Sequence, residues 1–142
     1  MTEAHFSRSF EIRGGDIAKA GRVSTEIKDL LKGMGCNASF IRRVAIASYE
    51  AEMNVVMYAR RATLVLHVTP EVVELDLTDE GPGIPDIDLA MQEGYSTATP
   101  EMRELGFGAG MGLPNIKRNT DAFEITSELH RGTALVMTVH VS

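Results

Sequence analysis

Cysteine is nearly absent from this sequence, in which Cys36 stands alone. One thiol cannot form a disulfide within the chain, and it is too little for a cysteine-based zinc cluster. We expect Cys36 to be a small, buried apolar side chain in a reducing cytoplasm rather than a nucleophile. Histidine is also sparse and has no ligand-like spacing, so no metal signature is visible in His5, His67, His130 and His140.

Long apolar runs and an excess of basic residues are missing as well. No stretch approaches the roughly 18 apolar residues of a membrane span, and the N-terminal residues lack the apolar block of a signal peptide. The formal net charge is -6, whereas proteins that coat nucleic acids need clustered lysine and arginine. We therefore expect a cytoplasmic protein with no membrane and no nucleic-acid partner. Its 142 residues fit a single domain, 1–142.

Hydrophobic periodicity divides the chain into helices and strands. Apolar residues at three- and four-residue steps predict a helix over residues 17–34, capped by Asp16, and a second from Asn37 or Ser39 to about Ala59. Shorter helices are expected over residues 84–93 and 113–120, and alternating apolar residues predict strands at 6–13, 62–69, 71–78, 123–129 and 133–141. Because helices and strands do not alternate strictly, the pattern favours an α+β fold, a two-layer α/β sandwich, over a doubly wound parallel sheet.

Glycine is concentrated in two short motifs that hold six of the 13 glycines. Four of these glycines occupy every second position just before a predicted helix, at Gly106, Gly108, Gly110 and Gly112. The motif lacks the Gly-Lys-Ser/Thr of a P-loop, and no strand precedes it, as a dinucleotide fingerprint requires. Its backbone amides could still close over phosphates at the start of a helix. The alternative is an ordinary surface loop within the segment 94–112.

The second glycine motif is Asp79-Glu80-Gly81-Pro82-Gly83, which follows a predicted strand. Its glycines allow a sharp turn, while the aspartate is held at the end of the strand. A buried carboxylate in this position can accept a hydrogen bond from the amino group of a nucleotide base. A plain tight turn fits the same five residues equally well, since aspartate and glycine are common in turns.

A narrow polar stripe crosses the second predicted helix, whose apolar residues surround much of its circumference. Glu50 and Asn54 are one turn apart, and at about 100° per residue Arg43 and Arg61 fall on the same side. The amide oxygen of Asn54 suits Mg²⁺, and the Glu50 carboxylate can accept a proton from an attacking hydroxyl. The alternative is a solvated stripe in which Arg43 or Arg61 pairs with Glu50.

These motifs, in this order, resemble those of the GHKL (Bergerat-fold) ATPase superfamily. They are Glu50-x-x-x-Asn54, Asp79-x-Gly81-x-Gly83, the glycine series that ends in Leu113, and Gly132-Thr133 before the last strand. Together they span nearly the whole chain. Within the superfamily the sequence is most similar to the small serine kinases of bacterial sigma-factor regulation, the anti-sigma factor kinases and the stressosome switch kinases. The resemblance implies a mixed, mostly antiparallel sheet with helices on one face.

The resemblance also implies how the base of ATP is bound. Asp79 would bind the adenine amino group, and Gly81 belongs to the same base-binding motif. Gly83 and Thr133 would lie beside the base, with Ile84 against its face. The charged neighbour Glu80 would have to point outward.

The resemblance also implies that two side chains and a backbone lid bind the ATP phosphates and promote phosphoryl transfer. Asn54 would hold Mg²⁺, and Glu50 would be the general base. The lid over the ATP phosphates would be formed by the backbone of Gly106, Phe107, Gly108, Ala109, Gly110, Met111, Gly112 and Leu113.

The activity implied by this resemblance is that of an ATP:protein serine/threonine kinase. Its substrate would be a seryl or threonyl hydroxyl on a small STAS-domain antagonist, and several members of the family pair as homodimers or hold a sigma factor. Phosphoryl transfer needs mainly positioning and charge balance, which these residues can supply. One alternative is an anti-sigma module that binds its partner under control of ATP or ADP with slow or absent catalysis. Another is a detached histidine-kinase catalytic domain, which would need a phosphoacceptor helix with an exposed histidine that the sequence does not supply.

Overall fold

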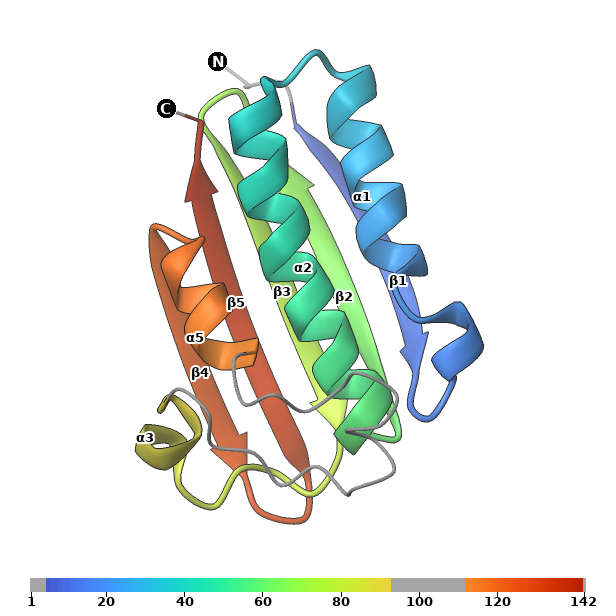
Figure 1. Ribbon diagram of the computed structural model, residues 1–142, viewed down its shortest axis with the longest axis vertical. Coiled ribbons are helices and arrows are strands. Elements are labelled where there is room, and N and C mark those ends of the chain that lie inside the picture. Colours follow the sequence, from blue (N-terminus) through green and yellow to red (C-terminus); the bar gives the residue numbers. More distant parts are fainter. Residues whose placement is uncertain (1–4, 93–111, 142) are drawn as a thin grey trace.

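The computed structural model describes residues 5–92 and 112–141, which form one antiparallel sheet with helices on one face (Figure 1). The strands lie in the order β1-β2-β3-β5-β4. They are β1 (Phe6–Arg13), β2 (Arg61–Val68), β3 (Val72–Glu80), β4 (Ala122–Glu128) and β5 (Gly132–His140). The helices are α1 (Arg22–Gly33), α2 (Ala38–Tyr58), α3 (Ile87–Ala90) and α5 (Gly112–Arg118). The expected α+β class is confirmed, and all four neighbouring strand pairs are antiparallel.

The core lies between the sheet and the three longer helices, with α2 packed between α1 and α5 (Figure 1). Successive side chains of a strand point to opposite faces, and along β3 the buried ones are Val73, Leu75 and Leu77. The alternate positions of β3 therefore lie on the face that none of the described helices covers (Figure 1). This one-sided arrangement explains why the strands alternate between apolar and polar residues.

The expected first helix over residues 17–34, capped by Asp16, is wrong in its first turn. Residues Ile17–Lys19 form a separate 3-10 helix, and the Asp16 side chain makes no capping hydrogen bond. Gly21 follows with φ of 91°, a left-handed conformation that no helix interior accepts, so α1 begins only at Arg22. The second helix is capped as expected, because the Asn37 side chain accepts a hydrogen bond from the Phe40 amide.

Several boundaries also differ from the expected ones. Strand β3 continues through Glu80, so Asp79 lies within the strand rather than after it. Arg61 belongs to β2 and not to the polar stripe of the second helix. Helix α3 covers only part of the segment 84–93. In residues 5–92 and 112–141, no helix is long and apolar enough to cross a membrane.

Candidate functional site

A cavity of about 320 Å³ lies where the C-terminal half of α2 meets β3, β5 and the turn after β3. Most of its wall is apolar, with Ala51, Met57, Leu77 and Leu135 among the lining residues. Six of the residues singled out in the sequence also line it: Asn54, Asp79, Gly83, Ile84, Leu113 and Thr133. A mostly apolar cavity with a few converging polar groups is typical of a small-molecule site.

Asp79 is the half-buried carboxylate of this cavity. Its Oδ1 accepts a hydrogen bond of 3.0 Å from the backbone amide of Thr133, on the neighbouring strand. Burial raises the pKa of the Asp79 carboxyl, and the Thr133 hydrogen bond partly opposes that change. Within residues 5–92 and 112–141, Oδ2 has no hydrogen-bond partner. One oxygen is therefore held by the sheet while the other can accept a hydrogen bond from a ligand.

Glycine is required where the turn after β3 meets the β4–β5 hairpin. Gly83 has φ of 78°, and a Cβ there would lie 2.5 Å from the carbonyl oxygen of Glu128. A Cβ on Gly132 would lie 2.0 Å from the carbonyl oxygen of Asp79. Any side chain at these positions would push the hairpin away from Asp79. Gly81 is not among the residues that line the cavity. Its backbone amide donates a hydrogen bond to the carbonyl oxygen of Arg131.

Ser127 supports the cavity from β4, although the sequence motifs did not reveal it. Its hydroxyl accepts a hydrogen bond of 2.7 Å from the Ile84 amide and lies 3.0 Å from the hydroxyl oxygen of Thr133. Ser127 and Thr133 lie directly opposite each other in the pairing of β4 with β5. The sequence motifs do not show this contact, because it depends on the register of the two strands. The serine thereby connects the turn after β3 to the hairpin.

The polar stripe of α2 faces the first turn of α5. Asn115 donates a hydrogen bond of 3.2 Å from Nδ2 to Oε2 of the half-buried Glu50. A Cβ on Gly112 would lie 3.3 Å from Oδ1 of Asn54, so the start of α5 runs close beside this side chain. Glu50 is one turn from the cavity-lining Asn54 but is not itself among the lining residues. Asn115 is a second residue that the motifs missed.

The alternative in which arginine pairs with Glu50 is not what the structure shows. Arg43 forms its ion pair with Asp121, at 3.1 Å. Arg61 pairs with Glu80, whose side chain is exposed and points away from the cavity. Glu50 therefore forms neither of the arginine ion pairs considered from the sequence. Its hydrogen-bond partner among the described residues is the side-chain amide of Asn115.

Part of the expected lid cannot be placed. Gly106, Phe107, Gly108, Ala109, Gly110 and Met111 lie outside the described residues, and so does most of the segment 94–112. The last two lid residues are described: Gly112 begins α5 and Leu113 lines the cavity.

Comparison with known proteins defines the class. The chain belongs to the histidine kinase-like ATPase domain family, whose profile matches residues 15–139. The resemblance to the GHKL superfamily is confirmed by this match, and ATP is the nucleotide that such domains use.

The individual relatives include a serine/threonine-protein kinase and several anti-sigma F factors. The serine/threonine-protein kinase RsbT of Bacillus subtilis (strain 168) is 29% identical over 112 residues, which are 76% of this chain and 78% of that protein. The anti-sigma F factor of Priestia megaterium is 31% identical over 118 residues, 83% of this chain and 70% of the relative. The anti-sigma F factor of Thermoanaerobacter sp. (strain X514) is 25% identical over 124 residues, which are 87% of this chain and 79% of the relative.

Proposed function

We propose that this protein is an ATP-dependent serine/threonine protein kinase that acts in a bacterial sigma-factor or stress-signalling pathway. The observation that carries the proposal is the convergence of Asn54, Asp79 and Thr133 on one cavity, with Glu50 one helical turn away. The similarity to RsbT, which is named a serine/threonine-protein kinase, supports the same activity. The substrate would be a seryl or threonyl hydroxyl of a small STAS-domain partner.

The cavity suits the adenine base of ATP. Oδ2 of Asp79 is available to accept a hydrogen bond from the exocyclic amino group, while Oδ1 stays bound to the Thr133 amide. Ile84 offers an apolar side chain against the face of the ring, and Gly83 leaves room for the edge. An acceptor held in an apolar wall favours a base that carries an amino group over one that carries a carbonyl at the same position.

Asn54 and Glu50 have the chemistry needed next to the phosphates. The Asn54 amide oxygen is a neutral ligand of the kind that Mg²⁺ takes alongside waters and phosphate oxygens, and the ion would offset the phosphate charge. The start of α5, at Gly112 and Leu113, brings backbone amides next to this side chain. We assign the remaining lid residues, 106–111, to the same role from their sequence motif alone.

Glu50 would act as the general base. As the substrate hydroxyl oxygen bonds to the γ-phosphorus, the bond from that phosphorus to the bridging oxygen breaks and ADP leaves. The hydroxyl proton passes to the Glu50 carboxylate. Asn115 holds one oxygen of that carboxylate through its amide, which orients the other toward the incoming hydroxyl. Asn115 is thus a positioning residue.

Phosphotransfer to a purified partner tests the proposal. The full chain is incubated with γ-labelled ATP, Mg²⁺ and a STAS-domain protein from the same organism, and the label is followed with and without acid. Acid-stable phosphoserine or phosphothreonine on the partner is expected. Acid-labile phosphate would instead indicate a histidine-kinase catalytic domain, and an unlabelled partner would contradict the kinase assignment.

A second candidate function is a nucleotide-dependent anti-sigma module. It is favoured by the similarity to several proteins that are named anti-sigma F factor. In that case a sigma factor would be retained by the immobilised chain, and the amount retained would differ between ATP and ADP. The retained Glu50 and Asn54 favour catalysis, because pure binding needs no base. A homodimer is the assembly we propose for either function.

A further inference from the structure

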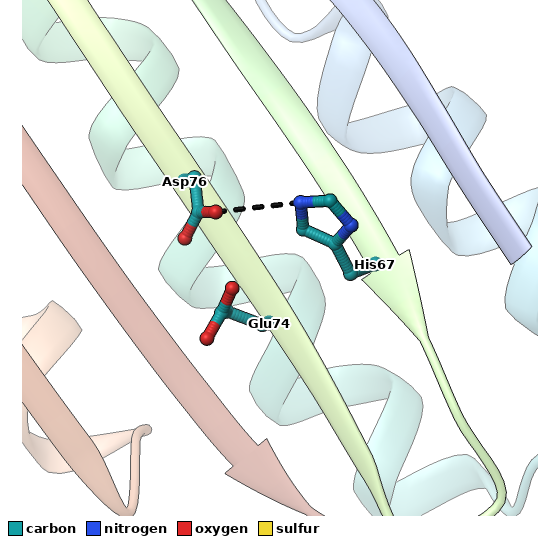
Figure 2. A group of neighbouring side chains, drawn as sticks. All are labelled: His67, Glu74 and Asp76. Carbon is teal, nitrogen blue, oxygen red and sulfur yellow. Dashed lines mark ion pairs between the residues drawn. The ribbon is translucent and has the colours of Figure 1, made fainter. Parts of the chain in front are cut away.

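Three side chains with metal-binding groups meet on the sheet face opposite the helices. Figure 2 shows His67 of β2 beside Glu74 and Asp76 of β3. The neighbours of Asp76 along β3, Leu75 and Leu77, are buried against the helices, so Asp76 points the other way. The cluster is therefore separated by the sheet from the cavity that contains Asp79.

Strand register creates this cluster. His67 is the direct partner of Glu74 in the β2–β3 pairing, and Asp76 is its diagonal neighbour two residues farther along β3. Side chains in these two relations are within reach of one another on one face of a sheet. A slip of one residue would place His67 among the core side chains, so the register that buries the core also assembles the cluster.

Hydrogen bonds orient the imidazole of His67. Its Nδ1 lies 2.9 Å from the hydroxyl oxygen of Ser7, which in turn lies 2.9 Å from Nε2 of His5. When Nδ1–H donates to Ser7 and the serine hydroxyl donates to His5, each group has one partner. In this tautomer Nε2 of His67 is unprotonated and available to a metal; it lies 3.3 Å from Oδ2 of Asp76, with which it forms an ion pair when the imidazole is protonated. Metal-binding histidines are commonly oriented through their other nitrogen in this way.

Negative charge in the cluster is incompletely compensated. Oδ1 of Asp76 is buried and has no hydrogen-bond partner among the described residues. The carboxylates of Glu74 and Asp76 are close neighbours on the same face of β3, where two negative charges repel each other. In the part of the chain that the structure describes, no arginine or lysine pairs with Glu74 or Asp76. A cation between the carboxylates would relieve this repulsion and give the buried oxygen a partner.

We propose that His67, Glu74 and Asp76 form a binding site for a Zn²⁺ ion. The candidate ligand atoms all lie within 4.8 Å of one another. Ligands of a tetrahedral Zn²⁺ are about 3.4 Å apart, a distance that small side-chain rotations bring within reach. An imidazole nitrogen favours zinc over magnesium or calcium, which prefer oxygen ligands. Three protein ligands on an open sheet face leave the fourth position to water.

Calorimetric titration of the untagged full chain with zinc chloride tests the site. The titration is done without nucleotide, so that Asn54 and the proposed kinase activity do not contribute. One Zn²⁺ per chain is expected, with no comparable binding of Mg²⁺. His67→Ala and Asp76→Asn should each weaken binding by at least about tenfold, since even loss of an outer partner of a metal ligand costs that much. His130→Asn, at an exposed turn with φ of 67° that asparagine tolerates, should leave binding unchanged.

Nitrogen NMR of the histidine rings identifies the liganded atom. On zinc addition the Nε2 signal of His67 should shift while Nδ1 keeps its proton. Equal zinc affinity in wild type, His67→Ala and Asp76→Asn would show an adventitious ion only and overturn the proposal. Absence of zinc binding by the wild type would overturn it as well. Neither result would bear on the kinase, because no nucleotide or partner takes part.

Discussion

The half-buried position of the Asp79 carboxylate favours ligand binding at the expense of the stability of the ligand-free protein. Burial raises the pKa of its carboxyl, which means that the folded protein disfavours the ionised form. Such a group adds to stability fully below its unfolded pKa, and this contribution is lost as pH rises through the folded pKa. At neutral pH the ionised carboxylate is therefore a cost to the free protein, which a bound amino group would offset.

Asp79→Asn should separate binding from stability. The amide has no charge to desolvate and can still accept from Thr133, so we expect the nucleotide-free variant to melt at or slightly above the wild-type temperature at neutral pH. ATP affinity should fall by about a hundredfold or more, because the amide donor would face the amino group of the base. Calorimetry with ATP and thermal melts measure the two effects. Unchanged ATP affinity would remove Asp79 from the site.

Glu50 and Asn115 should affect catalysis rather than nucleotide binding. Glu50→Ala is expected to bind ATP normally and lose phosphotransfer, because the base is absent. Asn115→Ala should keep ATP affinity and lower kcat by about tenfold, since the Glu50 carboxylate loses the amide donor that orients it. Single-turnover transfer to the partner is the measurement. Asn119→Ala is a matched control just after the same helix, because among the described residues the Asn119 side chain bonds only to the carbonyl oxygen of Asn115.

At the scale of an element, the start of α1 depends on a residue of α2. The N-cap position is Gly21, which has no side chain to offer. The carboxylate of Glu52 accepts hydrogen bonds from the amides of Gly21, Val23 and Ser24 instead, at 3.2, 3.1 and 3.0 Å. Glu52 is only 2% exposed, so it compensates buried amides that would otherwise have no partner. This contact also joins α1 to the helix that carries Glu50 and Asn54.

Glu52→Gln should lower the free energy of unfolding by about 2 kcal/mol. The NH₂ group of glutamine would face backbone N–H groups, which also donate, so a hydrogen bond would be lost. Urea denaturation measures the change. Glu26→Gln is the matched control, since Glu26 forms exposed ion pairs with Arg8 and Arg22. It should change stability by less than about 0.5 kcal/mol. Equal effects of the two substitutions would refute the capping role of Glu52.

The β4–β5 hairpin should be intolerant of a side chain at Gly132. A methyl group there would overlap the carbonyl oxygen of Asp79, so Gly132→Ala should destabilise the protein by about 3 kcal/mol and weaken ATP binding. Gly33→Ala is a matched control at the end of α1, where a Cβ would meet nothing within 4 Å. That substitution should stabilise slightly, by about 0.5 kcal/mol, because alanine loses less backbone entropy than glycine. Thermal melts with and without ATP separate the two effects.

At the scale of the whole molecule, the cavity exists only when α2, β3, β5 and α5 are packed together. ATP with Mg²⁺ should therefore bind the folded state alone and raise the melting temperature as its concentration increases. At a free ATP concentration of a hundred times the dissociation constant, the gain in the free energy of unfolding is about 2.7 kcal/mol. In Asn54→Ala the part of this gain that depends on Mg²⁺ should disappear. A Mg²⁺ effect of wild-type size in that variant would show that Asn54 is not the metal ligand.

Local signals along the chain made much of this molecule predictable. Alternating residues identified β2 and β3, and the candidate caps Asn37 and Ser39 located the start of α2 to within two residues. The order of the motifs from Glu50 to Thr133 indicated the family. Each of these signals depends on neighbours within a few residues. Strand register and helix breaks were harder to predict. The apolar periodicity runs from Ile17 past Gly21 into α1, but the left-handed conformation of Gly21 interrupts the helix there.

The sequence by itself determined the fold class, the two glycine motifs, and the pairing of Glu50 with Asn54 one turn apart. Only the tertiary structure decided that Asn115 contacts Glu50, that Ser127 supports Thr133, that Glu52 caps α1, and that His67 meets Glu74 and Asp76. The reason is physical. The first group follows from the periods of one helix or strand, whereas the second joins residues of different elements through packing and strand register, which no local pattern encodes.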